Sequence, residues 1–586
     1  MKQSKLTWLT QATMAFASST CMHMALAADT AEQTRQMQEQ EKSASNIYKA
    51  YFPNIEMARK AAITFHAQLL EANYETGYMV FELTPQDMAQ LKQFGFKMRP
   101  ATEFMEQRKK FLNNMQSETL RLQQQGVPAD AKAAAAAAAT IPSFPCYETV
   151  EETYSQAQAF ATSKPNLATW LDAGNSWEKS VNLGGYDIKV LKLTNSAITG
   201  NKPKLFVNSA IHAREYTTAP LNLEFARWLV NGYGINADAT WILDHHEVHL
   251  MLQTNPDGRK KAETGLSWRK NTNQAYCSAT SNTRGADLNR NFSFSFNSTA
   301  GQGSSSNQCD LTYRGPSAAS EPETQAIEAY VRSLWPDQRG LNLTDAAART
   351  TSGIHIDLHS FSQLVLWPWG TTSTPSGNAT DLQTLGRKLA FFNGYAPQQS
   401  IGLYPTDGTS DSVSYGELGV AAYTIELGTS FFQTCNTYTN KIKPDNLNAL
   451  IYAAKVVRTP YITPSGPDMS ALSLGGTASS TGVQVGTAVS LTGTATDTRY
   501  NNTNGTQPTQ TIAGAEYYID TPPWLSGATP TALAARDGTF SAKTEAVVGT
   551  INTSSLSVGK HIVYVRSRDA NGSWGAFSAA FLQVNP

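Results

Sequence analysis

The chain carries His212 and Glu215 in an H-x-x-E spacing within the segment 208–216. The apolar run 205–207 comes directly before this segment and is typical of a buried strand leaving the core. An imidazole and a carboxylate at a strand end, together with one distant ligand, can hold a zinc ion and leave one position for water. The spacing therefore predicts a metallohydrolase. The alternative is a polar turn whose side chains satisfy one another.

A candidate for the distant ligand is His359, which ends the alternating segment 354–359. Such alternation is typical of a strand with two unlike faces. His355 and Asp357 share the strand face of His359, because successive side chains point to opposite faces. The pattern leaves two readings open for them, support of the ligand or packing alone.

His245, His246 and His249 form an H-H-x-x-H pattern that could hold a second metal ion. We expect these histidines to open a strand. Alternation would then place His246 and His249 on opposite faces, which argues against a second site.

The candidate ligands need a rigid frame, and the segment 143–460 alternates helical patterns with apolar strand patterns. This alternation is typical of an α/β domain. The predicted strands are 188–193, 205–208, 247–253, 353–358, 364–367 and 421–426. The predicted helices are 220–231, 321–333, 379–392 and 444–457. Sites in open α/β sheets lie beyond the carboxyl ends of strands, where both His212 and His359 are expected.

Several short motifs occur in a fixed order around these candidates. They are NPDG at 255–258, WRKN at 268–271, DLNRNF at 287–292, Tyr404, and YTIEL at 423–427. In this order they resemble the zinc metallocarboxypeptidases of the pancreatic carboxypeptidase A/B type, in the secreted branch that carries a prodomain. The resemblance covers about 143–458 in detail. It implies an α/β fold with a mixed eight-stranded sheet flanked by helices.

The resemblance implies that His212, Glu215 and His359 bind one zinc ion (Zn2+) in the catalytic domain. Two neutral imidazoles and one carboxylate would leave the ion a strong Lewis acid. The resemblance also implies that Asp287 orients His212 by fixing the tautomer of its ring.

Two catalytic side chains follow from the same resemblance. Glu426, on an otherwise apolar strand, would take a proton from water and pass it to the leaving amine. Arg269 would stabilise the oxyanion that develops on the scissile carbonyl. The alternatives are a paired strand carboxylate for Glu426 and a surface salt bridge for Arg269.

Substrate contacts are implied in the same way. Asn289 and Arg290 would grip the terminal carboxylate of a peptide, Arg290 through a two-pronged guanidinium contact. This grip would make the enzyme an exopeptidase. Tyr404 is the counterpart of a mobile tyrosine that closes over substrate, with a core or loop aromatic as the alternative. Arg214 corresponds to a further subsite arginine.

Asp411 matches the position that selects the terminal side chain in the resembled family. An acidic residue there is typical of the branch that removes C-terminal Lys or Arg, because a buried carboxylate favours a cation. The alternatives are an Asp411 that caps a turn, and an enzyme that prefers apolar C-terminal residues. A further alternative is the same fold used as a cell-wall peptide hydrolase or endopeptidase.

The overall charge excludes some classes of partner. The net charge is -1, from 46 basic and 47 acidic residues, so no global field favours nucleic acid or an anionic membrane. We expect the partners to be peptide or protein C-termini. Residues 1–27 combine a basic start, a mostly apolar run and a small-residue cleavage site, which predicts a secretory signal peptide. A signal peptide predicts a secreted protein, extracellular or periplasmic, that has no transmembrane anchor after the signal is removed. The alternative is that this segment is retained as a membrane anchor.

Cysteine usage agrees with export. Removing the signal removes Cys21 and leaves Cys146, Cys277, Cys309 and Cys435. Four cysteines allow three pairings into two disulfides. Cys277 with Cys309 would brace one polar loop, and Cys146 with Cys435 would tie the start of the middle domain to its end.

Composition divides the chain after the signal into five parts. These are an α+β prodomain (43–101), a connecting helix and linker (102–142), the catalytic domain (143–458), a linker (459–467) and an all-β sandwich of immunoglobulin or fibronectin type (468–586). In the prodomain we predict strands at 47–52, 69–83 as a pair, and 96–99, with helices at 55–65 and 85–94.

Roles for the flanking domains are less constrained by the sequence. The prodomain is expected to inhibit the catalytic domain until the connector near the alanine run 133–139 is cut, and a permanent folding aid is the alternative. The sandwich could bind a surface or polymer, bind substrate, or aid secretion.

Overall fold

The computed structural model describes residues 46–65, 68–74, 76–110, 113, 117, 141 and 143–586. Its chain separates into two compact units, Met1–Lys110 and Phe111–Pro586. The predicted signal peptide and the alanine run 133–139 lie outside the described residues. Within the described part of the chain, no helix is long and apolar enough to cross a membrane.

The N-terminal unit is a four-stranded antiparallel sheet in the order β2-β3-β1-β4, with two helices. Its elements are β1 (Ile47–Tyr51), α2 (Ile55–Thr64), β2 (Leu69–Asn73), β3 (Tyr78–Glu82), α3 (Pro85–Gln93) and β4 (Lys97–Pro100). Thr84 begins α3 through a reciprocal capping pair with Asp87, which satisfies N–H groups that have no partner inside the helix. The predicted small α+β fold is confirmed.

The central sheet of the second unit has eight strands in the order β11-β10-β12-β9-β7-β8-β6-β5. Strands β12, β9, β7 and β8 run parallel, whereas β10 and β6 are antiparallel to this group. The strands are β5 (Ala168–Asn175), β6 (Asp187–Leu193), β7 (Lys204–Ser209), β8 (Glu247–Met251), β9 (Ile354–His359), β10 (Leu364–Trp367), β11 (Ala396–Gln399) and β12 (Ala421–Glu426). The predicted mixed eight-stranded sheet is confirmed.

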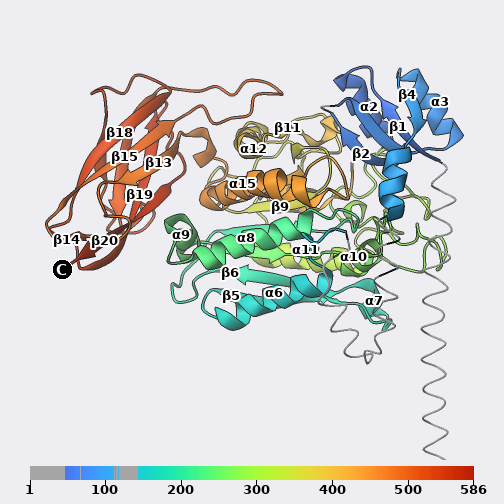
Figure 1. Ribbon diagram of the computed structural model, residues 1–586, viewed down its shortest axis with the longest axis horizontal. Helices are drawn as coiled ribbons and strands as arrows, with labels where there is room; N and C mark the ends of the chain where they lie inside the picture. The colour runs from blue at the N-terminus through green and yellow to red at the C-terminus, as the bar shows by residue number, and fades with distance from the viewer. Residues whose placement is uncertain are drawn as a thin grey trace, which may run out of the picture. The chain divides into compact units, whose positions relative to one another are not determined.

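Helices cover both faces of this sheet, and Figure 1 shows α8 and α15 alongside it. Alternation along β7 explains the two cores: Leu205 and Val207 pack with α8, α12 and α15, whereas Phe206 packs with α11. The principal helices are α6 (Val150–Ser163), α8 (Thr218–Gly232), α9 (Ala237–His245), α10 (Pro256–Glu263), α11 (Pro322–Leu334), α12 (Ala379–Asn393), α13 (Ser410–Gly416) and α15 (Lys443–Val456). Because both faces are covered, every residue of β9 is buried.

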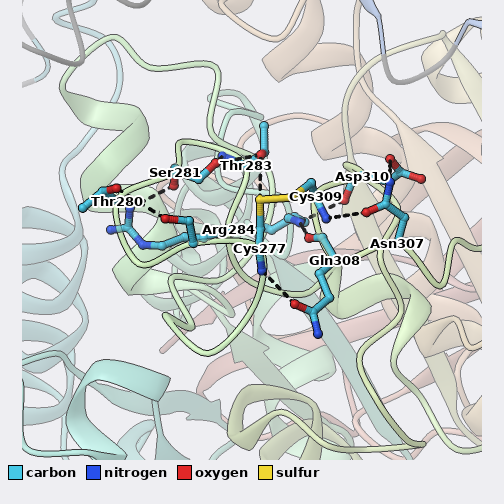
Figure 2. Close-up of a disulfide and its surroundings, with 11 residues drawn as sticks. Cys277, Thr280, Ser281, Thr283, Arg284, Asn307, Gln308, Cys309 and Asp310 are labelled. Atoms are coloured by element: carbon cyan, nitrogen blue, oxygen red, sulfur yellow. Dashed lines mark hydrogen bonds between the residues drawn. A yellow bond between two sulfur atoms is a disulfide. The ribbon is translucent and has the colours of Figure 1, made fainter.

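Two disulfides brace the domain that contains the central sheet. Cys146 pairs with Cys435, and Cys277 pairs with Cys309. Figure 2 shows the second bridge in its polar loop, where the main-chain N–H of Cys277 donates to Gln308 Oε1 at 3.0 Å. The structure thus selects one of the three pairings that the sequence allows.

Residues from Asp468 onward form an all-β domain. Its strands are β13 (Asp468–Leu474), β14 (Val483–Gln484), β15 (Ala488–Thr496), β16 (Ile512–Ile519), β17 (Thr531–Ala535), β18 (Thr544–Asn552), β19 (Gly559–Asp569) and β20 (Ser578–Asn585). They form one continuously hydrogen-bonded sheet in the order β13-β15-β18-β17-β16-β19-β20-β14. Buried side chains from its two halves, such as Leu491 and Val565, share one core.

The C-terminal all-β domain packs against the domain that contains the central sheet. The Trp524 ring centre lies 5.9 Å from that of Trp241 on α9 and 6.3 Å from that of His246. Lys388 on α12 reaches the first residue of β13, with 3.0 Å between Lys388 Nζ and Asp468 Oδ2. We call these five residues the domain seam.

Candidate metal centre

Three parallel strands end at one edge of the central sheet. They are neighbours in the order β12-β9-β7, and Glu426 of β12 is in register with His359 of β9. Each of these two residues is the last of its strand. His212 lies in the turn that directly follows β7. The carboxyl edge of the sheet therefore gathers a carboxylate and two imidazoles, and the two imidazoles lie at the strand ends where the sequence predicts them.

His212, Glu215 and His359 converge on one point, with ligand atoms within 4.8 Å of one another. The two oxygens of Glu215 lie 2.9 Å from His212 Nδ1 and 3.2 Å from His359 Nδ1. The two Nδ1 atoms are 3.1 Å apart, and all three side chains are buried. The main-chain N–H of Ser360 donates to Glu215 Oε2 at 3.1 Å, a contact that has no signal in the sequence.

Asp287 connects this cluster to Arg269. Asp287 Oδ1 lies 3.0 Å from His212 Nε2, and Oδ2 accepts from Nε and Nη2 of Arg269 at 3.0 and 2.8 Å. Since His212 Nδ1 faces the cluster, its Nε2 carries the proton and donates to Asp287. Burial alone would raise the pKa of Asp287, but Arg269 and His212 hold it well below its usual range.

Two buried polar atoms beside the three metal donors make no hydrogen bond to any described residue, and we call them the open atoms. Glu426 Oε2 and Arg269 Nη1 have no hydrogen-bond partner among the described residues. Burial raises the pKa of Glu426 to about 7. Buried polar atoms normally have partners, and the position of these two atoms beside three converging metal donors indicates groups that meet a ligand.

A family model described as zinc carboxypeptidase matches residues 153–449, just over half of the 586 residues. The chain belongs to the zinc carboxypeptidase family. The matched segment contains the three metal-donor residues and also Glu426 and Arg269, which carry the open atoms. Members of the family use one catalytic zinc ion, and the donor set of two imidazole nitrogens and one carboxylate in this chain fits that ion.

Curated relatives support this membership. The chain is 31% identical to rat (Rattus norvegicus) carboxypeptidase A1 over 242 residues, which is 41% of this chain and 51% of the relative. It is 30% identical to a zinc carboxypeptidase of Saccharothrix mutabilis subsp. capreolus over 291 residues, 48% of this chain and 62% of the relative. The chain thus spans about half the length of the first relative and less than two thirds of the second.

A solved structure supports the fold. The carboxypeptidase A of Helicoverpa armigera has a TM-score of 0.52 and 22% identity to this chain, and the match covers 71% of this chain and 97% of that one.

The residues expected to hold substrate have the following contacts in the structure. Arg290 Nε donates to the main-chain oxygen of Gly303, and Nη1 to that of Asn289, both at 2.7 Å. The Arg290 guanidinium carbon lies 5.9 Å from the ring centre of Tyr404. The structure therefore brings Arg290 and Tyr404 together.

Asn289 and Asp411 lie on the side formed by α13. Asn289 Oδ1 accepts from the main-chain N–H of Ser410 at 2.9 Å, and its Nδ2 lies 3.1 Å from His359 Nε2. Asp411 is buried in the first turn of α13, and this burial raises the pKa of its carboxyl group. A side-chain hydrogen bond from Thr409 acts in the opposite direction.

The Arg214 side chain contacts other side chains of the protein, Phe431 and Ser267. Its guanidinium carbon is 4.0 Å from the ring centre of Phe431, and its Nη1 donates to Ser267 Oγ at 3.3 Å. It is buried in this arrangement. Its role as a subsite arginine stays a prediction.

The expectation that the H-H-x-x-H histidines open a strand is confirmed only for His249, which lies in β8. His245 ends α9, and β8 begins only after His246, because the helix continues to the edge of the sheet. His246 Nδ1 lies 2.9 Å from the main-chain oxygen of Ala454, and His249 Nδ1 lies 2.8 Å from Tyr330 Oη.

Proposed function

We propose that this protein is a secreted zinc-dependent carboxypeptidase that removes C-terminal residues from peptides and proteins. The observation that carries the proposal is the pair of open atoms, Glu426 Oε2 and Arg269 Nη1, beside the His212, Glu215 and His359 cluster. A proton acceptor and a fixed cation next to a zinc donor set supply the groups that peptide hydrolysis requires.

Each side chain has a distinct part in this reaction. Bound zinc supplies Lewis-acid chemistry that polarises a scissile carbonyl and activates water. Glu426 accepts a proton from the attacking water and returns it to the leaving amine, and a pKa raised to about 7 suits both transfers. Arg269 donates from Nη1 to the carbonyl oxygen as negative charge develops there. Asp287 holds both Arg269 and His212 in place through its two oxygens.

Arg290 makes the proposed activity an exopeptidase activity. Its guanidinium is fixed by two main-chain oxygens and lies beside Tyr404, so it offers a preformed site for a terminal carboxylate. Tyr404 would close over the bound residue. Asn289 would contact the same carboxylate after giving up its contacts with α13.

We also propose a preference for C-terminal Lys or Arg, through Asp411. A buried carboxylate in the subsite would pair with a cationic side chain and would face an apolar one with an unpaired charge. A preference for apolar C-terminal residues is the alternative, and it follows if Asp411 only caps the first turn of α13.

Secretion and latency complete the proposal. The predicted signal peptide supports export to the extracellular space or the periplasm, and the two disulfides suit an oxidising compartment. The N-terminal α+β unit would act as an inhibitory prodomain. The C-terminal domain is available for binding a surface or polymer.

The proposal is tested by turnover of hippuryl-Arg, hippuryl-Lys and hippuryl-Phe, with and without a metal chelator. We expect hydrolysis that the chelator abolishes and added zinc restores, with the Arg and Lys substrates preferred. Hydrolysis that is unchanged by the chelator would refute the metal mechanism, and preferred turnover of hippuryl-Phe would refute the role of Asp411. Limited trypsin treatment of the precursor should raise activity, and no change would count against latency.

A further inference from the structure

Asp357 lies on β9, and its side chain points to the same face of the strand as that of the ligand His359. Its Oδ2 is 3.0 Å from His359 Nε2, and no part of the Asp357 side chain is exposed. The sequence leaves open whether Asp357 supports the ligand or only packs, because the answer depends on which way the His359 ring is turned.

The ring orientation settles which nitrogen meets which partner. His359 Nδ1 faces Glu215 and His212 at 3.2 and 3.1 Å, so this nitrogen is the one that would bind the metal. Nε2 then carries the hydrogen and donates it to Asp357. In this tautomer the Asn289 amide nitrogen, 3.1 Å from the same atom, is not its acceptor. Asp357 is therefore the acceptor that fixes the ring.

Asp357 is itself fixed by two donors. Asn208 Nδ2 donates to Oδ1 at 2.7 Å, and Ser410 Oγ donates to Oδ2.

A second row of contacts fixes Asn208. His355 Nε2 donates to Asn208 Oδ1 at 2.6 Å, and His355 Nδ1 accepts from Ser414 Oγ at 2.7 Å. Burial lowers the pKa of His355 to about 4, so the ring is neutral and can have one donor and one acceptor nitrogen. The hydrogen bonds thus join β7, β9 and α13 behind the metal ligand.

We propose that Asp357 is a positioning residue for the zinc ligand His359, in a second carboxylate and histidine pair beside that of Asp287 and His212. Asp357 sets the tautomer and the angle of the His359 ring, and Asn208 and Ser410 hold Asp357. Partners of this kind typically change metal affinity about 10–100-fold when they are removed. The inference rests on the proposed zinc site.

The test uses the full-length protein, stripped of metal, and measures zinc affinity by competition with a chelating dye. We expect Asp357→Asn to weaken zinc binding about 10-fold and Asp357→Ala to weaken it about 100-fold. In both variants the visible spectrum of the cobalt-substituted protein should differ from that of the native protein. Ser410→Ala, which removes one donor to Asp357, should give a smaller loss and covers the case in which the Asp357 variants fail to fold.

Asp407→Asn is the matched control. Asp407 is also fully buried, but it accepts from Thr299 instead of a histidine. This variant should lower the melting temperature of the metal-free protein and leave zinc affinity unchanged. Native zinc affinity and cobalt spectra in all three test variants would overturn the inference, whereas failure of the native protein to bind zinc would overturn the proposed function instead.

Discussion

At the carboxyl edge of the central sheet, Glu426 and Arg269 each keep a buried polar atom without a partner among the described residues. The domain seam also has buried atoms without a partner in the described part of the chain, Asp468 Oδ1, Trp524 Nε1 and His246 Nε2, but its side chains are paired across two domains. There the buried Lys388 is paired with Asp468, and Trp524 packs on Trp241. The α9 part of the seam lies toward the amino end of β8, because α9 leads into that strand, and Figure 1 shows α9 beside the C-terminal domain.

This difference separates groups retained for chemistry from groups retained for stability. A buried polar atom without a partner costs about 1–3 kcal/mol. At the carboxyl edge of the sheet, the unpartnered atoms belong to a carboxylate and a guanidinium beside three converging metal donors, which indicates a site that meets a ligand. At the seam the side chains with unpartnered atoms are held between the two domains by a charge pair and by ring contacts. Substitutions at the two places should therefore affect different measurements.

The largest effect on catalysis is expected at the carboxyl edge of the central sheet, beside the metal donors. Glu426→Gln keeps the shape of the side chain but removes the proton acceptor, so kcat/KM should fall about 10²–10⁴-fold. The melting temperature should stay the same or rise slightly, because an open carboxylate has been removed from the interior. Steady-state kinetics and thermal unfolding of the same preparation check both parts. Retention of native kcat/KM would contradict the role of Glu426.

The next effect is expected at the seam. Lys388→Met should reduce the free energy of unfolding by roughly 3–5 kcal/mol, because it leaves Asp468 buried without its cation. Lys388→Met combined with Asp468→Leu should recover most of the loss. Urea unfolding measures the free energies, and kcat of the folded variants should stay native. A loss below about 0.5 kcal/mol in the single variant would show that the pair does not hold the seam.

A smaller loss is expected from the aromatic part of the seam. Trp524→Ala should lower the free energy of unfolding by about 2–4 kcal/mol, since the ring is only partly buried. The neighbour Leu525 is 44% exposed, so Leu525→Ala should change stability by less than about 0.5 kcal/mol. Equal effects of the two substitutions in urea unfolding would argue against the packing role of Trp524.

The smallest effect concerns pH. Because burial raises the pKa of Glu426 to about 7 and only its ionised form accepts a proton, kcat/KM should fall as pH drops through this region. Bound zinc favours the ionised form and would move the midpoint below 7. A pH profile should show this acid limb in the native protein and in Lys388→Met, and lose it in Glu426→Gln. Persistence of the limb in Glu426→Gln would assign it to another group.

The central strands were predictable from the sequence, and the edge strands were not. Strands β10 and β12 match their predicted ranges, because strands buried on both faces give continuous apolar runs. No strand is predicted at β5 or β11, which form the two edges of the sheet. Strand β11 contains Pro397, and edge strands tolerate proline because one side needs no partner.

Contacts between distant segments were also out of reach. The composition of 459–467 predicts a linker, yet this segment contains the short helix η5 (Thr463–Ser465) and the buried Tyr461. The ligands His212 and His359 could be named because their motifs are local. The part played by Asp357 could not, because it depends on the orientation of a ring and on donors from β7 and α13.

The most direct test of the central claim compares one peptide in two forms, with a free C-terminal carboxylate and with a C-terminal amide. Mass spectrometry of the zinc-loaded protein should show stepwise loss of single residues from the free peptide and almost none from the amide, because Arg290 needs a carboxylate to grip. Equal cleavage of both forms, or cleavage at internal bonds, would contradict the account and favour an endopeptidase on this fold.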